Sequence, residues 1–137
     1  MRIEHIAIWT ENIELLRAFY QKYFDAVCGN KYTNSVKQFT SYFLSFGEGS
    51  ARIELMHTPT IGTLPDAKYI GLAHFAVSVG SRDKVDELTN RLRADGYTLL
   101  SEPRTTGDGY YESAVADPEG NLCGNNGIVE AKKRIYQ

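Results

Sequence analysis

The chain has 137 residues, 42% of them hydrophobic and 23% charged, and a net charge of −2. These values are typical of a single globular domain, and the absence of a long Lys/Arg run excludes a strongly basic nucleic-acid surface. No apolar run approaches the roughly 20 residues of a membrane span, and the charged N-terminus has no signal-peptide core. We therefore expect a cytoplasmic protein without nucleic-acid or membrane partners, in which Cys28 and Cys123 are reduced.

The first half of the chain predicts one strand, one helix and three more strands. The alternating run IEHIAIW at 3–9 is typical of a strand, and it contains His5. Apolar residues then recur at spacings of three and four, which predicts a helix with Asn12 as its N-cap. The strand-like runs that follow lie at 26–33, 39–46 and 51–57.

The second half predicts the same order of elements. The run LAHFAVS at 72–78 resembles the first strand and contains His74. An amphipathic helix follows, with Ser81 as a plausible N-cap and Gly96 as its C-terminal stop. Turn sequences TGDG and DPEG then separate strand-like runs at 97–104, 110–116 and 121–125.

A β-α-β-β-β order that occurs twice indicates an internal duplication. We therefore predict an α+β fold in one domain, residues 1–137, built from modules at about 1–57 and 71–125. The Pro- and Gly-containing segment 58–70 is interpreted as a linker. Within the tail, 126–137, the run at 127–137 could form a short basic helix, and we interpret the tail as a solvated end or a dimer contact.

Glu54 is an unusual residue for its place in the chain, because it interrupts an apolar strand. Its neighbours Ile53 and Leu55 should face the opposite side of the sheet. An inward carboxylate is costly to bury unless it is paired or binds a metal. Together with His5 and His74, which occupy equivalent places in the two halves, it makes a donor set suited to Zn, Ni, Co, Mn or Fe. We therefore predict a divalent-metal site with positions left open for water or substrate.

The duplication also predicts a gap in this site. Glu54 follows His5 at nearly the same distance at which Gly124 follows His74. Gly124 therefore occupies the place of a second carboxylate but offers no donor atom. By strand alternation Cys123 should point away from the gap.

The chain resembles the vicinal oxygen chelate superfamily, which includes glyoxalase I, extradiol dioxygenases and bleomycin resistance proteins. The segments that carry the resemblance are, in order, IEHIAIWTENIELLRAFYQKYF, ARIELM, GLAHFAVSV and YYESAVADPEGN. The resemblance covers residues 1 to about 125. It implies two βαβββ modules that form a cupped, open barrel around a divalent metal, a small substrate bound through adjacent oxygens or an oxyanion, and a homodimer.

The metal-ligand pattern of glyoxalase I carries over only in part. One His and one Glu from each module correspond here to His5, Glu54 and His74, whereas Gly124 replaces the final Glu. In glyoxalase I that Glu also serves as a proton-transfer base. Glu112, on the preceding strand, is our candidate for this catalytic role.

The residues that would recognise glutathione also differ. Trp9 stands where bacterial glyoxalase I has an arginine that holds a glutathione carboxylate, and Thr58 stands where an asparagine is typical. We therefore expect a lyase or isomerase that acts through a metal-stabilised enediolate without glutathione.

Two alternative functions follow from the same residues. Two His and one carboxylate match the facial triad of an Fe(II) extradiol-type dioxygenase. A non-catalytic, bleomycin-resistance-like protein would instead sequester a ligand between aromatic walls. The candidate substrate-binding residues for such walls are Trp9, Tyr42, Tyr110 and Tyr111.

Overall fold

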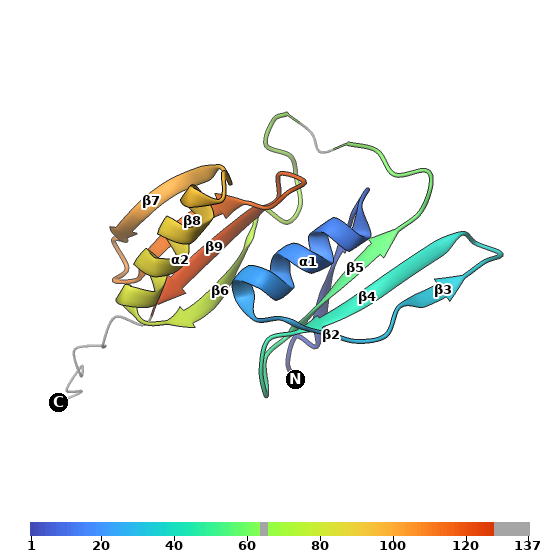
Figure 1. Ribbon diagram of the computed structural model, residues 1–137, viewed down its shortest axis with the longest axis horizontal. Helices are drawn as coiled ribbons and strands as arrows, with labels where there is room; N and C mark the ends of the chain where they lie inside the picture. The colour runs from blue at the N-terminus through green and yellow to red at the C-terminus, as the bar shows by residue number, and fades with distance from the viewer. Residues whose placement is uncertain (64–65, 128–137) are drawn as a thin grey trace. The chain divides into compact units, whose positions relative to one another are not determined.

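The computed structural model describes residues 1–63 and 66–127. The chain forms two compact units, one from Met1 to Ala67 and the other from Lys68 onward. In each unit a helix lies on one face of a mixed sheet (Figure 1). The predicted α+β fold class is confirmed, and each unit repeats the predicted order of strand, helix and further strands.

The first unit contains one helix and five strands. Their bounds are β1 (His5–Trp9), α1 (Ile13–Phe24), β2 (Val27–Cys28), β3 (Tyr32–Asn34), β4 (Phe39–Ser45) and β5 (Arg52–His57). The sheet order is β1-β5-β4-β2, and β3 also pairs with β4. The predicted strand at 26–33 is two short strands instead, because Gly29 and Asn30, which favour turns, interrupt it.

Helix α1 begins and packs as its sequence predicts. The Asn12 side chain accepts a hydrogen bond from the backbone N–H of Leu15 at 3.1 Å and so caps the helix. Its apolar stripe includes Leu16 and Tyr20, which are fully buried against the sheet, where Leu55 is also fully buried. Burial of a leucine side chain contributes about 1.5–3 kcal/mol, so Leu16 and Leu55 help to fix which face of this sheet the helix covers.

The second unit contains one helix and four strands. Their bounds are β6 (Phe75–Gly80), α2 (Arg82–Ala94), β7 (Leu99–Thr105), β8 (Tyr111–Ala116) and β9 (Leu122–Gly127). The sheet order is β6-β9-β8-β7. The Ser81 hydroxyl accepts a hydrogen bond from the backbone N–H of Lys84 at 3.3 Å, which confirms the predicted cap. Val85 and Leu92 of α2 and Val115 of β8 are fully buried in this core.

Three boundaries differ from the sequence prediction. Strand β6 begins at Phe75, so His74 precedes the strand instead of lying inside it. Strand β9 continues to Gly127, so residues 126 and 127, expected in the tail, pair in the sheet. The basic helix expected in the tail lies outside the described residues. Neither described helix has the length and apolar character needed to cross a membrane.

Candidate metal-binding site

Strand alternation places three predicted site residues on one face of the first sheet. Ile53 and Leu55 of β5 are buried beneath α1, so Glu54 between them points to the opposite face. We call the face of each sheet opposite its helix the open face. The parallel pairing of β1 with β5 puts His5 and Trp9 on the open face as well.

His5 and Glu54 are close enough to bind one ion together. His5 Nε2 lies 3.7 Å from Glu54 Oε2. Bonds from zinc to nitrogen or oxygen ligands are about 2.0–2.2 Å long, so two donors up to roughly 4.2 Å apart can share an ion. An imidazole and a carboxylate also have the donor chemistry that the predicted metals accept. The pair therefore fits a divalent ion.

Two further residues, Glu4 and Arg52, surround His5. The Glu4 carboxylate accepts a hydrogen bond from His5 Nδ1 and, on Oε1, a second one from Arg52 Nε at 2.7 Å. The hydrogen bond with His5, followed by the hydrogen bond and charge of Arg52, holds the pKa of Glu4 below its usual value, although desolvation opposes this. Neither residue was predicted from the sequence. Two features of the sequence could have indicated them. Glu4 directly precedes His5, and Arg52 lies two residues before Glu54 and therefore on the same face of the strand.

Phe43 of β4 forms the floor beneath this group. It pairs with Glu54 across the sheet and therefore lies on the open face. The His5 ring meets the Phe43 ring edge-on at a centroid distance of 5.3 Å. The guanidinium carbon of Arg52 lies 4.1 Å from the same ring centroid, within the range of a cation–π interaction.

The register of the second sheet shows which position corresponds to Glu54. In the first unit Ala7 pairs with Glu54, and in the second Ala76 pairs with Gly124. Each alanine follows its histidine by two residues. A Cβ built on Gly124 would meet the Cβ of Ala76 at 3.2 Å, a tight contact that requires one of the two strands to shift by a few tenths of an ångström. The φ angle of Gly124 lies outside the left-handed region, so its backbone conformation is one that other residues adopt.

Glu112 lies on the same face of the second sheet as Gly124. Its strand neighbour Ala114, two residues on, pairs directly with Gly124. The Glu112 side chain is one-third exposed, and its Oε1 lies 3.8 Å from Arg104 Nη2. His74 is exposed immediately before β6, two residues before the residue that pairs with Gly124.

Two tyrosines predicted as substrate walls face the helices instead. The Tyr42 hydroxyl donates a hydrogen bond to Glu14 of α1 at 2.9 Å, and the Tyr111 hydroxyl donates to Asp86 of α2 at 2.7 Å. Strand alternation thus puts both rings on the covered faces of their sheets, so they do not line the open faces. Tyr110 is exposed just before β8, and Trp9 is exposed on the open face of the first sheet.

Other candidate donors are occupied or buried. Cys123 is fully buried on the helix side of its sheet, and this burial raises the pKa of its thiol. His57 donates its Nδ1–H to the backbone carbonyl of Thr10 at 2.8 Å. Across 1–63 and 66–127, no three His, Cys, Asp or Glu side chains gather closely enough to hold a metal ion. The structure thus brings together two of the three predicted ligands, His5 and Glu54.

These features agree with the comparison to known proteins. The chain belongs to the Glyoxalase/Bleomycin resistance protein/Dioxygenase superfamily, whose family model matches residues 2–123. Comparison with curated proteins finds no significant match. The resemblance seen in the sequence is therefore confirmed at the level of the superfamily.

Several solved structures share the fold at low sequence identity. The trypanothione-dependent glyoxalase I of Leishmania major is 20% identical, with a TM-score of 0.75 over 93% of this chain and 86% of that one. A glyoxylase/bleomycin resistance protein/dioxygenase domain from Frankia sp. EAN1pec is 17% identical, with a TM-score of 0.80 over 94% and 98%. Glyoxalase I from Zea mays is 19% identical, with a TM-score of 0.76; the match covers 94% of this chain but only 45% of the maize chain.

Proposed function

We propose that the protein is a metal-dependent enzyme of the lyase or isomerase type that acts on a small substrate with two adjacent oxygens. The observation that carries this proposal is the separation of 3.7 Å between His5 Nε2 and Glu54 Oε2 on an open sheet face. A carboxylate and an imidazole at this separation suit a shared divalent ion. Membership of the superfamily supports the same reading.

His74 is the proposed third ligand. Its place relative to Ala76 matches that of His5 relative to Ala7, and its side chain is exposed. With Gly124 in the place of a fourth ligand, the ion keeps an additional position for water or substrate. The variant Gly124→Glu should therefore bind the metal more tightly, because it adds an anionic ligand.

The proposed reaction needs a base as well as a metal. When bound, the ion supplies Lewis-acid chemistry that polarises a carbonyl group and stabilises an enediolate. Glu112 is the proposed group that removes and returns the substrate proton, because it shares the open face with Gly124 and is partly solvent-accessible. The Arg104 guanidinium, whose Nη2 lies 3.8 Å from Glu112 Oε1, is a cation beside this proposed base.

The open face of the first sheet suits a substrate other than a glutathione adduct. The open face carries the exposed indole of Trp9 at the position where an arginine would hold a glutathione carboxylate. An indole offers an apolar contact and one N–H donor but no positive charge. The substrate is therefore proposed to be a small hydroxycarbonyl compound without a glutathione moiety.

The test combines metal content with proton exchange. Protein purified without a histidine tag is analysed for bound metals, and α-hydroxyketones and α-hydroxyaldehydes are followed by NMR in D₂O. We expect α-proton exchange that requires the metal and is abolished by Glu112→Gln, whereas Glu102→Gln, an exposed acid in β7, serves as the control. No exchange across the panel with metal-loaded protein, or oxygen uptake with catechols, would contradict the proposal.

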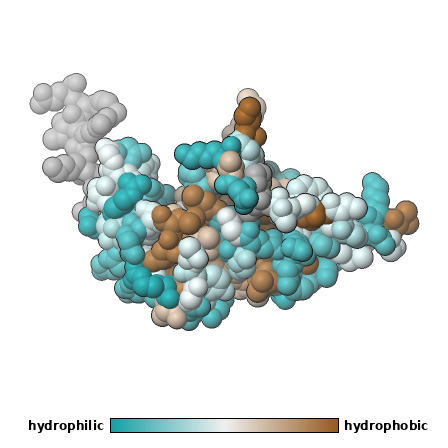
Figure 2. All heavy atoms as spheres, turned by 90° about the horizontal axis from the view of Figure 1, so that it is seen from above, coloured by the Kyte–Doolittle hydropathy of each residue, from teal (hydrophilic) through white to brown (hydrophobic). Residues whose placement is uncertain are grey.

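A row of aromatic rings favours a second candidate function, ligand sequestration. Trp9 meets Phe39 edge-on at 6.4 Å between ring centroids, and Phe39 lies 6.1 Å from Tyr32. Hydrophobic residues (brown) also reach the surface in several places among hydrophilic ones (teal) in Figure 2. Such rings can stack on a flat ligand without a metal.

Tryptophan fluorescence tests this second function directly, because the chain has one tryptophan. A sequestering protein should show saturable quenching of Trp9 emission by flat aromatic ligands when no metal is present. Loss of saturation in Phe39→Ala, with folding unchanged, would support sequestration. If quenching occurs only with metal-loaded protein, the enzyme proposal stands instead.

A further inference from the structure

We propose that Glu4, held in place by Arg52, is a positioning residue that orients the His5 ring toward the metal. The inference rests on the proposed function, because it assigns His5 as a ligand through Nε2. It adds residues that the ligand pattern does not contain, and it explains how an exposed histidine on an open sheet face could be held ready for an ion.

The two oxygens of the Glu4 carboxylate have separate partners. Oε1 accepts a hydrogen bond from Arg52 Nε at 2.7 Å and lies 2.5 Å from Arg52 Nη2. Oε2 is thereby left to accept the hydrogen bond from His5 Nδ1. The backbone strengthens this arrangement, since the N–H of Arg52 donates to the carbonyl of Glu4 at 2.9 Å.

This arrangement determines which nitrogen of His5 is available to a metal. An ionised carboxylate only accepts hydrogen bonds, so the proton of a neutral His5 ring must be on Nδ1. The lone pair of Nε2 is then free, and Nε2 is the atom that lies 3.7 Å from Glu54. A carboxylate on the far nitrogen of a metal-binding histidine fixes its tautomer and ring orientation and makes it a better ligand.

Phe43 completes the support. The His5 ring and the Arg52 guanidinium both lie against its ring, at centroid distances of 5.3 and 4.1 Å respectively. The four side chains therefore form a closed circuit in which each residue contacts two others. Glu4 and His5 are each nearly half exposed, so a single hydrogen bond would hold the ring poorly, whereas a circuit restricts it from several directions.

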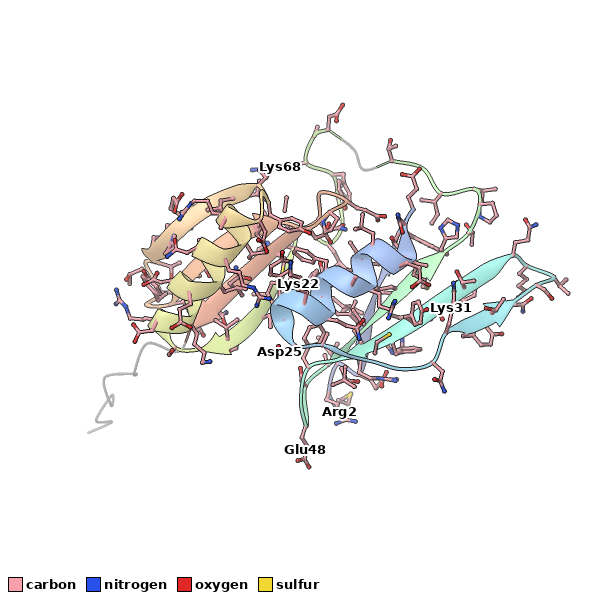
Figure 3. All side chains as sticks on the ribbon, in the orientation of Figure 1. Arg2, Lys22, Asp25, Lys31, Glu48 and Lys68 are labelled. Carbon is pink, nitrogen blue, oxygen red and sulfur yellow. The ribbon has the colours of Figure 1, made fainter. Side chains whose placement is uncertain are left out.

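The first test measures metal affinity. Metal-free protein is titrated with Co²⁺ and Zn²⁺ against a chelator, using the wild type, Glu4→Ala, Glu4→Gln and the control Glu48→Ala. Glu48 changes the net charge equally but lies at the tip of the β4–β5 turn and points away from the sheet (Figure 3). We expect Glu4→Ala to bind about 10–100 times more weakly and Glu48→Ala to bind like the wild type. Glu4→Gln should keep part of the affinity, because its amide oxygen still accepts a hydrogen bond.

The second test measures the His5 tautomer without any metal. Nitrogen-15 NMR of the imidazole should show the proton on Nδ1 in the wild type and in Glu48→Ala, and a mixture of tautomers in Glu4→Ala. Arg52→Met should shift the tautomer in the same direction by a smaller amount, since it loosens Glu4 without removing it. Thermal unfolding of each variant confirms that the fold is intact.

The two tests separate this inference from the proposed function. If the wild type binds no metal, the proposed function fails, and the tautomer measurement still decides the role of Glu4. If the wild type binds metal but Glu4→Ala has the same affinity and the same tautomer, the role of Glu4 is refuted while the metal site remains.

Discussion

Two glycines of β9, three residues apart, should respond very differently to replacement by alanine. A Cβ on Gly127 would lie 2.6 Å from both the carbonyl carbon and oxygen of Ser81, and 3.1 Å from the backbone nitrogen of Arg82. That carbonyl oxygen accepts the first hydrogen bond of α2, from the N–H of Val85 at 3.1 Å. Gly127→Ala therefore forces the helix start away from the sheet.

The magnitude follows from what has to move. Overpacking in a close-packed region costs typically about 1–3 kcal/mol, and we expect the upper end for Gly127→Ala because backbone must shift. A loss of about 3 kcal/mol corresponds to a melting temperature lower by roughly 10 °C for a chain of this size. At Gly124 the contact is with the Cβ of Ala76 at 3.2 Å, and alanine gains about 0.5–1 kcal/mol over glycine in a strand. Gly124→Ala should therefore change stability by less than about 1 kcal/mol.

The assay is urea and thermal unfolding of both variants and the wild type under one set of conditions. The outcome matters for function, because it tests whether the fold itself demands glycine where the second carboxylate is missing. Equal destabilisation by the two substitutions, or a neutral Gly127→Ala, would refute the steric argument.

Three further results are expected. In native protein a thiol reagent should label Cys28, which is partly exposed, and leave the buried Cys123 unmodified until the protein unfolds. Burial raises the pKa of both thiols, so the labelling of Cys28 should become faster at alkaline pH. Desolvation raises the pKa of Glu14, but hydrogen bonds from Lys31 and Tyr42 outweigh it and leave the pKa below the ordinary value of 4.5. The contribution of Glu14 to stability is therefore present above pH 4.5 and is lost as the pH falls through the lowered pKa. Stability measured against pH should consequently fall less steeply at acid pH in Glu14→Gln than in the wild type. Leu55→Ala should reduce the free energy of unfolding by about 2–5 kcal/mol in denaturant titrations, because Leu55 is fully buried.

Periodicity and duplication predicted most of the fold. Apolar spacing identified both helices, and Asn12 and Ser81 were recognisable as caps because a short polar side chain before an apolar stripe has few other roles. The break in the strand at 26–33 was not predicted, because the β-forming residues around Gly29 and Asn30 favour one continuous strand. Strand ends were likewise off by a few residues, since pairing partners set them more than local sequence does.

The candidate site was predictable only where alternation applies directly. Parity with Ile53 and Leu55 correctly placed Glu54 on the open face. For Tyr42 alternation was not enough, because its face depends on which residue of β5 it pairs with. That partner is Leu55, and the register between the two strands cannot be read from the sequence. Glu4 precedes β1, so alternation did not predict its contacts with His5 and Arg52.

The central claim, that His5 and Glu54 bind a metal ion, is tested most directly by one competition titration. Zn²⁺ affinity is measured against a chelator for the wild type, Glu54→Gln and the charge-matched control Glu48→Gln. We expect one ion per chain in the wild type and in Glu48→Gln, and affinity at least about tenfold weaker in Glu54→Gln, because that variant lacks the only assigned anionic ligand. Equal affinity in all three proteins, or no binding in the wild type, would contradict the claim.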